Sequence, residues 1–418
     1  MSMAIAQNQN NLPRWAQHGQ PVDITNAAFK ADPFPFYAWL RAEHPVYKAR
    51  LGQKPVWLVT RYDDVMALLK DERFVKNPAN VGDTKATPPA FWLPGFFKAM
   101  ATNMLDQDDP NHARLRALVQ KAFTPARVEQ MQADILATCH RLLDRVEAQG
   151  HMDLVADFAL QLPLTVISEL MGIPEPDRLR FHQWVKAGLQ PPSTAATLLA
   201  LPKLWAMVRY LRQQFAARRL HPQEDLLSAL VQAEEAGDKL SEDELLGMAV
   251  ILLIAGYETT VNLLASGTLA LLQHPEQCQL LRANPALIKP AIEELLRFCA
   301  PVEQATERYA REEVTIAGVT IPQGALVLAV LAAANRDEHY FANPDQLEIT
   351  RDKNRHFAFG YGAHSCIGMP LARLEGTIAI NTLLARLPKL RLAVPADQLR
   401  WRATPMVRGL VALPVAFS

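Results

Sequence analysis

The stretch Phe359-Gly360-Tyr361-Gly362-Ala363-His364-Ser365-Cys366-Ile367-Gly368 is a glycine-rich loop that restricts the possible folds more than any other part of the sequence. An apolar segment with helical periodicity follows it directly. The glycines of the loop permit turns in which a Cβ would clash, and they let a flat group approach closely. Pro370 suits the first turn of a helix. Cys366 therefore lies just before a helix N-terminus, where free N–H groups and the positive dipole end favour a thiolate. The alternative is a free, buried cysteine in a tight turn.

This loop resembles the haem-binding signature of the cytochromes P450, the haem-thiolate monooxygenases. That signature reads Phe, Gly, any, Gly, any, His, any, Cys, any, Gly, and every fixed position is met, from Phe359 to Gly368. The resemblance implies that Cys366 is the axial ligand of a haem b iron and that His364 hydrogen-bonds a haem propionate. The Leu-Ala-Arg-Leu-Glu sequence at 371–375 also fits the family.

Composition favours one large domain. The chain has 418 residues, of which 50% are hydrophobic, so it can bury a large core. No Ser/Gly-rich linker, repeat or long block of like charge divides it. We place an N-terminal extension at 1–31 and a cytochrome P450 haem domain at 32–418. Lys plus Arg equals Asp plus Glu at 43 each, so no overall charge indicates nucleic acid or an acidic membrane as partner.

The cysteines and the N-terminus indicate a cytoplasmic protein. The four cysteines are far apart and form no CxxC pair, which argues against a disulfide scaffold or a zinc ribbon and fits a reducing compartment. Residues 1–20 show neither a signal peptide nor a membrane anchor. The strongest apolar run, Met248 to Gly256, is too short to span a bilayer. We therefore expect no membrane association.

Periodicity predicts a mainly α fold with a minor β region. Helices are expected at Arg127–Gln149, Glu224–Ala236 and Ser241–Gln273, a strand at Val56–Thr60, and a hairpin at Val314–Ile316 and Val319–Ile321. The resemblance, unlike periodicity, implies the particular topology of the cytochrome P450 fold.

The segment Ser241–Gln273 is the second chemical feature. It opens with a Ser241-x-x-Glu244 capping box and would be about 50 Å long at about 1.5 Å per residue. Its apolar middle contains Ala255-Gly256-Tyr257-Glu258-Thr259-Thr260, and a buried carboxylate without partners is costly. One explanation is structural, namely a buried ion pair with threonines bonded to helix carbonyls. The other is proton delivery to oxygen.

This segment resembles the acid–alcohol motif of the same family. The resemblance makes Glu258 the acid and Thr259 the alcohol of a proton relay. It places Ala255 and Gly256 beside the haem, where Gly256 would leave room for oxygen.

A third motif, Glu294-Leu295-Leu296-Arg297, is a weak signal alone, because most such pairs are solvated and contribute less than about 1 kcal/mol. It lies about seventy residues before Cys366, in the order that the family shows. The resemblance implies a buried ion network of Glu294, Arg297 and Arg351 behind the haem. Loss of one partner would cost about 3–5 kcal/mol.

A haem brings two propionates, which need cationic or hydrogen-bonding partners. His112 and Arg116 are four residues apart in a helical segment, and the family has a His-x-x-x-Arg that binds propionate there. Arg308 matches a further propionate-binding arginine. With His364, these residues complete the set that the resemblance implies.

The substrate pocket is assigned by analogy only. It would be lined by the stretch before His112, by Lys186–Leu201, and by residues of later segments. The candidates are Phe91, Trp92, Phe96, Phe97, Ile251, Ala255, Val302, Thr306, Met406 and Val407. The aromatic cluster is either ordinary core or a substrate gate. Both alternatives predict an apolar pocket and a hydrophobic substrate.

The function that the resemblance implies is a monooxygenase that inserts one atom of O2 into a hydrophobic small molecule. The chain has no flavin or iron–sulfur module, so a ferredoxin or flavodoxin with its reductase would supply electrons. Arg114, Lys121, Arg355 and Arg373 form either a docking patch for an acidic partner or scattered solubilising charge. A peroxide-driven peroxygenase is the second hypothesis, although such enzymes usually lack the acid–alcohol pair. A non-catalytic haem protein that binds a ligand is the third.

Overall fold

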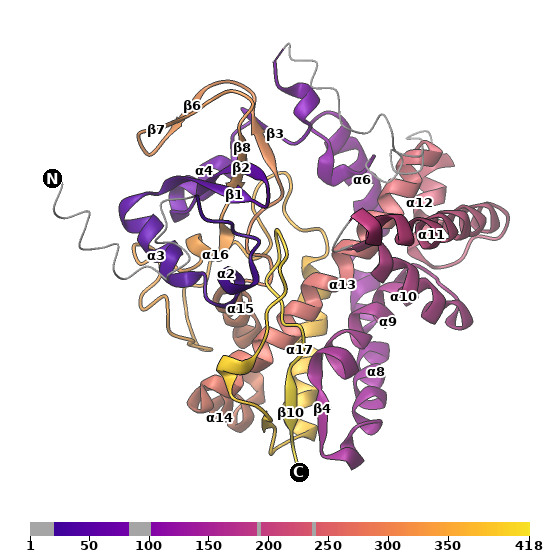
Figure 1. Ribbon diagram of the computed structural model, residues 1–418. Helices are drawn as coiled ribbons and strands as arrows, with labels where there is room; N and C mark the ends of the chain where they lie inside the picture. The colour runs from indigo at the N-terminus through magenta and orange to yellow at the C-terminus, as the bar shows by residue number, and fades with distance from the viewer. Residues whose placement is uncertain (1–20, 83–101, 190–193, 236–239) are drawn as a thin grey trace.

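The computed structural model describes residues 21–82, 102–189, 194–235 and 240–418, and most of them are helical. In Figure 1 the N-terminal strands and short helices lie on the left, the helices α8–α12 lie on the right, and α13 runs between them. The helices are α2 Ala27–Ala31, α3 Phe34–Glu43, α4 Tyr62–Lys70, α6 Asn111–Ala122, α7 Pro125–Gln130, α8 Gln132–Asp144, α9 Gln161–Leu170, α10 Glu175–Leu189, α11 Thr194–Leu220, α12 Leu226–Glu235, α13 Glu242–Gln273, α14 Pro275–Ala283, α15 Ile288–Cys299, α16 Leu331–Ala334 and α17 Met369–Arg386.

The strands are short and form three small sheets. One has the order β1-β2-β8-β5-β3, one has the order β4-β10-β9, and the third is the hairpin β6-β7. Their bounds are β1 Val46–Leu51, β2 Lys54–Val59, β3 Phe74–Val75, β4 His151–Asp153, β5 Arg308–Ala310, β6 Val314–Ile316, β7 Val319–Ile321, β8 Leu326–Ala329, β9 Arg391–Leu392 and β10 Pro414–Ala416. The predicted strand at 56–60 and the predicted hairpin are confirmed, and Ala317 and Gly318 both adopt the positive φ that its tight turn requires.

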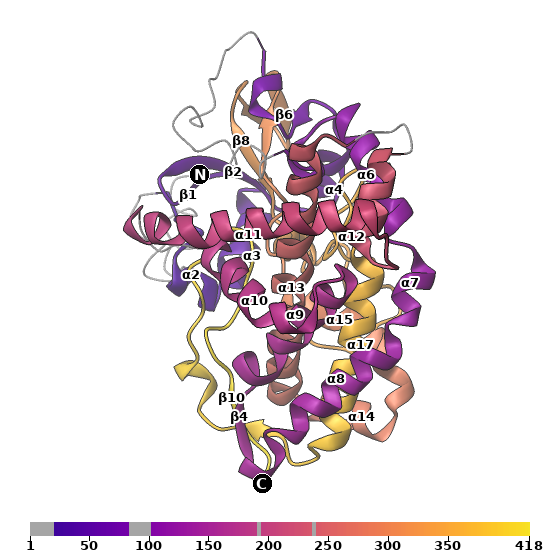
Figure 2. The same cartoon turned by 90° about the vertical axis from the view of Figure 1, so that its right-hand side faces the viewer.

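Helix α13 follows the predicted bounds closely. The Ser241 hydroxyl accepts from the Glu244 N–H at 3.2 Å, and the Glu244 carboxylate accepts from the Ser241 N–H at 2.8 Å, so the capping box is present. The helix contacts α9, α15 and α17, and α10 and α11 lie across it in Figure 2. In the described parts of the chain, α13 alone has the length and composition of a membrane span, and 67% of its most apolar window is buried inside the protein.

The prediction of one helix over Arg127–Gln149 is wrong. Met131 has ψ of −6°, which ends α7 and begins α8, and α8 itself ends at Asp144. The apolar residues Val128 and Ile135 keep helical spacing across the break. Periodicity therefore continues where the backbone hydrogen bonds are interrupted.

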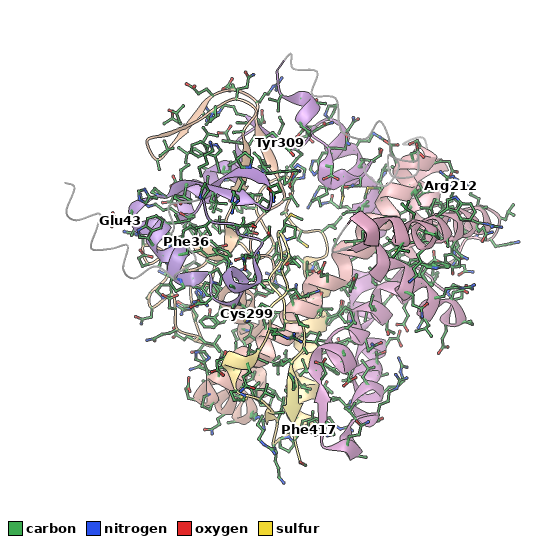
Figure 3. All side chains as sticks on the ribbon, in the orientation of Figure 1. Phe36, Glu43, Arg212, Cys299, Tyr309 and Phe417 are labelled. Atoms are coloured by element: carbon green, nitrogen blue, oxygen red, sulfur yellow. The ribbon has the colours of Figure 1, made fainter. Side chains whose placement is uncertain are left out.

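The N-terminal boundary also differs from expectation. Val22, Ile24 and Phe29 are buried in the same apolar cluster as Phe36, which lies on α3 among the strands and helices at the left of Figure 3. Residues 22–31 thus pack as part of the core rather than as an extension ending at residue 31. We propose that the domain begins no later than Val22.

Candidate active site

The cysteine loop has the geometry that its glycines and Pro370 require. Gly360 and Gly362 have φ of 68° and 74°, and a Cβ on Gly362 would lie 2.8 Å from the Leu69 carbonyl oxygen. Gly368 is the N-cap of α17, with Pro370 in the first turn. The Cys366 N–H donates to the Phe359 carbonyl at 2.9 Å. The loop is therefore closed on itself and places the sulfur just before the helix.

The charge on Cys366 depends on two opposing effects. Its side chain reaches accessible surface, yet the surrounding protein desolvates the sulfur and raises its pKa. The N–H groups of Gly368 and Met369 lower that pKa, as do Arg116 and Arg373. The predicted helix N-terminus effect is present but weaker than burial. A bound metal cation would supply the remaining stabilisation of the thiolate.

Helix α6 brings two of the predicted residues against the loop. Arg116 donates through Nη1 to the Ser365 carbonyl at 2.8 Å and through Nη2 to the Ser365 hydroxyl at 3.3 Å. The rings of His112 and His364 lie 4.0 Å apart, and Nδ1 of His112 is 3.2 Å from the Asp109 carboxylate. The His-x-x-x-Arg pair therefore meets the cysteine loop directly.

Lys76 joins Arg308 on the same side, and sequence reasoning missed it. Its buried ammonium donates to the Thr306 hydroxyl and, at 2.6 Å, to the Glu307 carbonyl. Arg308 is buried and donates to the Thr306 carbonyl at 3.3 Å. Lys76 follows β3, which pairs with the strand that begins at Arg308. That pairing joins distant parts of the chain, so no local motif indicates it.

These cations are arranged for a negatively charged group. Burial first, and then the positive charges of His112, Lys76, Arg308 and Arg116, lower the pKa of His364 to about 2. Burial and Arg308 lower the pKa of Lys76 to about 7, against opposing effects of Asp106, Glu307 and Asp108.

No carboxylate in the described ranges forms a salt bridge with Lys76, Arg116 or Arg308. Lys76 and Arg308 are buried, and buried cations need an anionic partner. Two haem propionates fit the residues that are present.

In the middle of α13, Glu258 has a partner that the sequence did not reveal. Nη1 of Arg402 lies 3.2 Å from the Glu258 carboxylate, and Nη2 donates to the Asn262 side-chain oxygen at 2.7 Å. Burial raises the pKa of Glu258, and Arg402 opposes that rise. Thr259 donates its hydroxyl to the Ala255 carbonyl at 3.0 Å. Both elements of the structural explanation, an ion pair and a threonine bonded to the helix, are thus observed.

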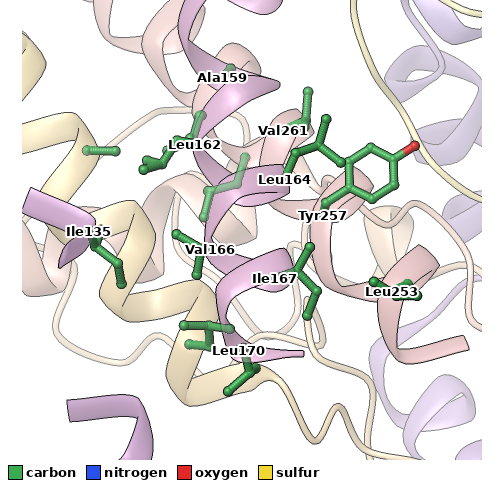
Figure 4. Packing of buried hydrophobic residues seen from close by; sticks show 14 of the residues in the cluster. Ile135, Ala159, Leu162, Leu164, Val166, Ile167, Leu170, Leu253, Tyr257 and Val261 are labelled. Carbon is green, nitrogen blue, oxygen red and sulfur yellow. The ribbon is translucent and has the colours of Figure 1, made fainter. Parts of the chain in front are cut away.

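Ala255 and Gly256, which precede Glu258 on α13, have different surroundings. Ala255 is exposed although the helix around it is largely buried. A Cβ on Gly256 would lie 2.8 Å from Cδ1 of Ile167 on α9. Figure 4 shows Ile167 packed beside Leu253 and Tyr257 of α13. The close approach of α9 is therefore one reason for glycine at this position, and the expected room for oxygen remains a prediction.

The structure brings Glu294, Arg297 and Arg351 together. Arg297 donates to both carboxylate oxygens of Glu294 at 2.8 Å, and the two side chains have 0% exposure. Nε of Arg351 lies 3.1 Å from the same carboxylate. The Glu348 N–H and the Asn354 amide also donate to it, at 2.9 Å and 3.1 Å. All of these donors make the Glu294 carboxylate a fully hydrogen-bonded buried anion.

The expected pocket residues are described only in part. Phe91, Trp92, Phe96 and Phe97 lie outside the described residues, as do the side chains of most of 186–201. Val302 and Val407 pair through an isolated antiparallel β-bridge, so these two candidate segments are adjacent. Ile251, Thr306 and Met406 are half-buried.

The expected basic patch is partly neutralised. Arg114 forms an ion pair with Glu244, and Arg373 makes two hydrogen bonds of 2.7 Å to Glu293. Arg355 and Lys121 are exposed. A docking surface built from all four side chains therefore has less net positive charge than the sequence suggests.

Comparison with known proteins places this geometry in a family. A family model described as cytochrome P450 matches residues 203–389. Polyketide biosynthesis cytochrome P450 PksS of Bacillus subtilis (strain 168) is 43% identical over 394 residues, covering 93% of this chain and 97% of the relative. Cytochrome P450 monooxygenase PikC of Streptomyces venezuelae is 46% identical over 391 residues, covering 93% and 91%.

Solved structures agree with the sequence matches. The PksS structure has a TM-score of 0.88 at 42% identity, covering 94% of this chain and 99% of that chain. The structure of P450BioI in complex with acyl carrier protein ligated to hexadec-9Z-enoic acid has a TM-score of 0.84 at 42% identity, covering 94% and 100%. The similarity extends over nearly the whole of each protein.

Proposed function

The chain belongs to the cytochrome P450 family, and from this premise we propose that Cys366 is the axial ligand of haem b in this protein. The enzyme is a haem-thiolate monooxygenase that hydroxylates or epoxidises a small-molecule substrate. The observation that supports the assignment of Cys366 best is the contact of Arg116 with the cysteine loop, beside the buried side chains of Lys76 and Arg308. None of these three cations has a carboxylate partner among the described residues.

The residues around the loop have separate roles in this proposal. Lys76, His112, Arg116, Arg308 and His364 would hold the two haem propionates by charge-assisted hydrogen bonds. Phe359, Gly368, Ala255 and Gly256 would border the ring, and Glu294, Arg297 and Arg351 would fix the chain behind it. When bound, the haem supplies the activation of O2 and the transfer of one oxygen atom to the substrate.

Proton delivery is the part of the reaction that we assign to α13. One atom of O2 enters the substrate and the other leaves as water, so two electrons and two protons enter in each turnover. The raised pKa of the Glu258 carboxyl lets it hold a proton more readily, and the Thr259 hydroxyl passes that proton on. Arg402 orients the Glu258 carboxylate and limits the rise in its pKa.

The presence of Glu258 and Thr259 favours this reaction over a peroxide-driven one. A peroxygenase receives both protons with the oxidant, so it has to move a proton between the two peroxide oxygens but does not have to draw protons from solvent. The relay also argues against a protein that only binds a ligand.

Substrate and partners are proposed from chemistry and from two relatives. PksS is named for polyketide biosynthesis, and P450BioI is seen with a fatty acyl chain on a carrier protein. We propose a hydrophobic polyketide or fatty acyl substrate within secondary metabolism. Electrons come from a ferredoxin or flavodoxin with its reductase, and we place the enzyme in the cytoplasm.

The test is optical and needs no substrate. Protein expressed with a haem precursor is reduced and exposed to carbon monoxide, and we expect the absorption band near 450 nm that is typical of thiolate-ligated haem. Cys366→Ser should abolish that band, whereas Cys278→Ser, at a buried cysteine on α14, should keep it. A band that persists in Cys366→Ser would overturn the assignment.

A further inference from the structure

The N-terminal segment contributes a buried polar cluster that the reaction described above does not use. Lys30 on α2 forms an ion pair with Glu303 in which both side chains have 0% exposure. The Tyr37 hydroxyl donates to the other Glu303 oxygen at 2.7 Å, and the Gln304 amide donates to the Tyr37 hydroxyl at 3.1 Å. We refer to Lys30, Tyr37, Glu303 and Gln304 as the Lys30 cluster.

The Lys30 cluster joins three segments that are far apart in sequence. The N–H groups of Glu303 and Gln304 both donate to the Met406 carbonyl, at 2.9 Å and 3.3 Å. Nζ of Lys30 also donates to the Pro405 carbonyl at 3.2 Å. The cluster therefore fixes the loop at 302–306 against the turn at 405–407.

Arg408 strengthens the same junction from the other side. Its Nε donates to the Lys30 carbonyl at 2.8 Å, and its Nη2 donates to the Ala31 carbonyl at 2.9 Å. The Arg408 N–H donates to the Pro301 carbonyl at 3.1 Å. The backbone at the end of α2 is thus bonded to the segment that follows Met406 and Val407.

Stability alone does not explain these charges. Replacement of a buried ion pair by apolar residues of similar volume is often neutral or stabilising, because desolvation offsets the Coulomb attraction. What the charges add is direction, since each hydrogen bond fixes one atom of one segment relative to another. The fixed segments carry Val302, Thr306, Met406 and Val407, which are the described candidates for the pocket wall outside α13.

We propose that Lys30 and Glu303 are positioning residues for the pocket wall, meaning the loop at 302–306 and the turn at 405–407. By fixing this wall they set which large ligands the pocket accepts. This inference rests on the proposed function, because it takes Val302, Thr306, Met406 and Val407 as pocket residues. Without the side chains of Lys30 and Glu303, the loop at 302–306 and the turn at 405–407 keep their backbone hydrogen bonds to each other but lose side-chain bonds that fix them to α2. A loosened wall loses shape complementarity to a large ligand and leaves a small iron ligand unaffected.

The experiment compares two azoles that bind haem iron, imidazole and the much larger clotrimazole, by the shift of the Soret band in the haem-loaded protein. The main variant is the charge-neutral double substitution Lys30→Met/Glu303→Gln. We expect its Kd for clotrimazole to rise by about fivefold or more, whereas its Kd for imidazole stays within about twofold of the starting protein. Tyr37→Phe removes a single hydroxyl, and its clotrimazole Kd should change in the same direction by about twofold.

A matched control distinguishes a displaced pocket wall from the general effect of losing any buried ion pair. Arg218 and Asp225 form such a pair at 2.7 Å, with 5% and 6% exposure, between the ends of α11 and α12. Arg218→Met/Asp225→Asn should leave the ratio of the two Kd values unchanged.

The outcomes distinguish the two proposals. An unchanged ratio in both Tyr37→Phe and the Lys30 double variant would overturn the positioning role, and so would an equal change in the Arg218 control. If the double variant does not fold, Tyr37→Phe decides the matter alone. If neither azole shifts the Soret band of the starting protein, the haem assignment itself fails, whatever the variants do.

Discussion

Lys76 is the residue whose surroundings depend most on long-range contacts. It is buried, it lies beside Arg308, and its pKa is lowered to about 7. The sequence shows only a lysine after a short apolar pair. By contrast, His112 and Arg116 belong to a local motif and were predicted, as was Cys366. Arg402 resembles Lys76 in this respect, because its partner Glu258 is more than a hundred residues away.

We predict that Lys76→Met weakens haem retention. The substitution removes one charged donor from the propionate site, and a hydrogen bond to a charged group is worth about 1.5–3 kcal/mol. Transfer of haem to excess apomyoglobin should therefore become roughly tenfold faster or more. Lys70→Met is the control, since Lys70 lies at the surface over the Tyr361 ring at 4.8 Å. Equal transfer rates in the two variants would contradict the assignment.

The Thr259 hydroxyl provides a second test of the proposed site. Thr259→Ala removes the hydroxyl that we assign to proton delivery, and general acid–base steps contribute about 10²–10⁴-fold to rates. With a surrogate redox chain, we expect more hydrogen peroxide and less product for each NADPH consumed.

Thr268→Ala is the matched control for Thr259. Its hydroxyl also donates to a helix carbonyl, that of Leu264 at 2.7 Å, but it lies more than two turns further along α13. Thr268→Ala should keep its coupling. Unchanged coupling in Thr259→Ala would show that the hydroxyl only bonds the helix.

Among the elements, helix existence was predictable and helix interruption was not. The capping box of α13 and the glycine turn before α17 are local signals, and both were found at the expected residues. The break at Met131 has no such signal, because it changes one ψ angle and leaves the apolar spacing intact. Periodicity reports which face is buried and does not report whether the backbone is continuous.

The packing of α9 against α13 gives a prediction about Gly256. Gly256→Ala places a Cβ 2.8 Å from Cδ1 of Ile167, and overpacking of this kind costs about 1–3 kcal/mol. Ile167→Val removes that Cδ1 atom. We expect Gly256→Ala to lower Tm and the double variant to recover most of the loss. Purely additive effects in thermal unfolding would contradict this contact.

In the molecule as a whole, the Glu294 network joins α15 to the segment at 344–354, which precedes the cysteine loop. Glu294→Gln leaves Arg297 buried without its counter-charge, at a cost of about 3–5 kcal/mol. We expect a matching loss in the free energy of urea unfolding. Glu242→Gln is the control, because Glu242 pairs with Arg219 at 2.6 Å and neither side chain is buried, with exposures of 51% and 29%, so it should cost less than about 1 kcal/mol. Similar losses would count against the network.

Periodicity predicted the mainly α class, and the resemblance to the family predicted the particular fold. The single large domain was expected because no linker or repeat divides the chain. The sequence placed the start of the domain at residue 32, and we propose an earlier start because Val22, Ile24 and Phe29 are buried in the core. Lys30 is an isolated charge in the sequence, and its ion pair with Glu303 joins residues 273 positions apart. A chain segment with such a partner belongs to the core, however weak its local pattern is.

The parallel pairing of β2 with β8 has a consequence for synthesis on the ribosome. Trp57, Leu58 and Val59 pair with Val327, Leu328 and Ala329, so the β2 edge has no neighbour until the distant strand has been made. At about 5–20 residues per second, that interval is on the order of tens of seconds. During this time the nascent β1–β2 ribbon carries an open hydrogen-bonding edge, which is a site for aggregation. Slow translation or low temperature would lengthen the exposure of this edge.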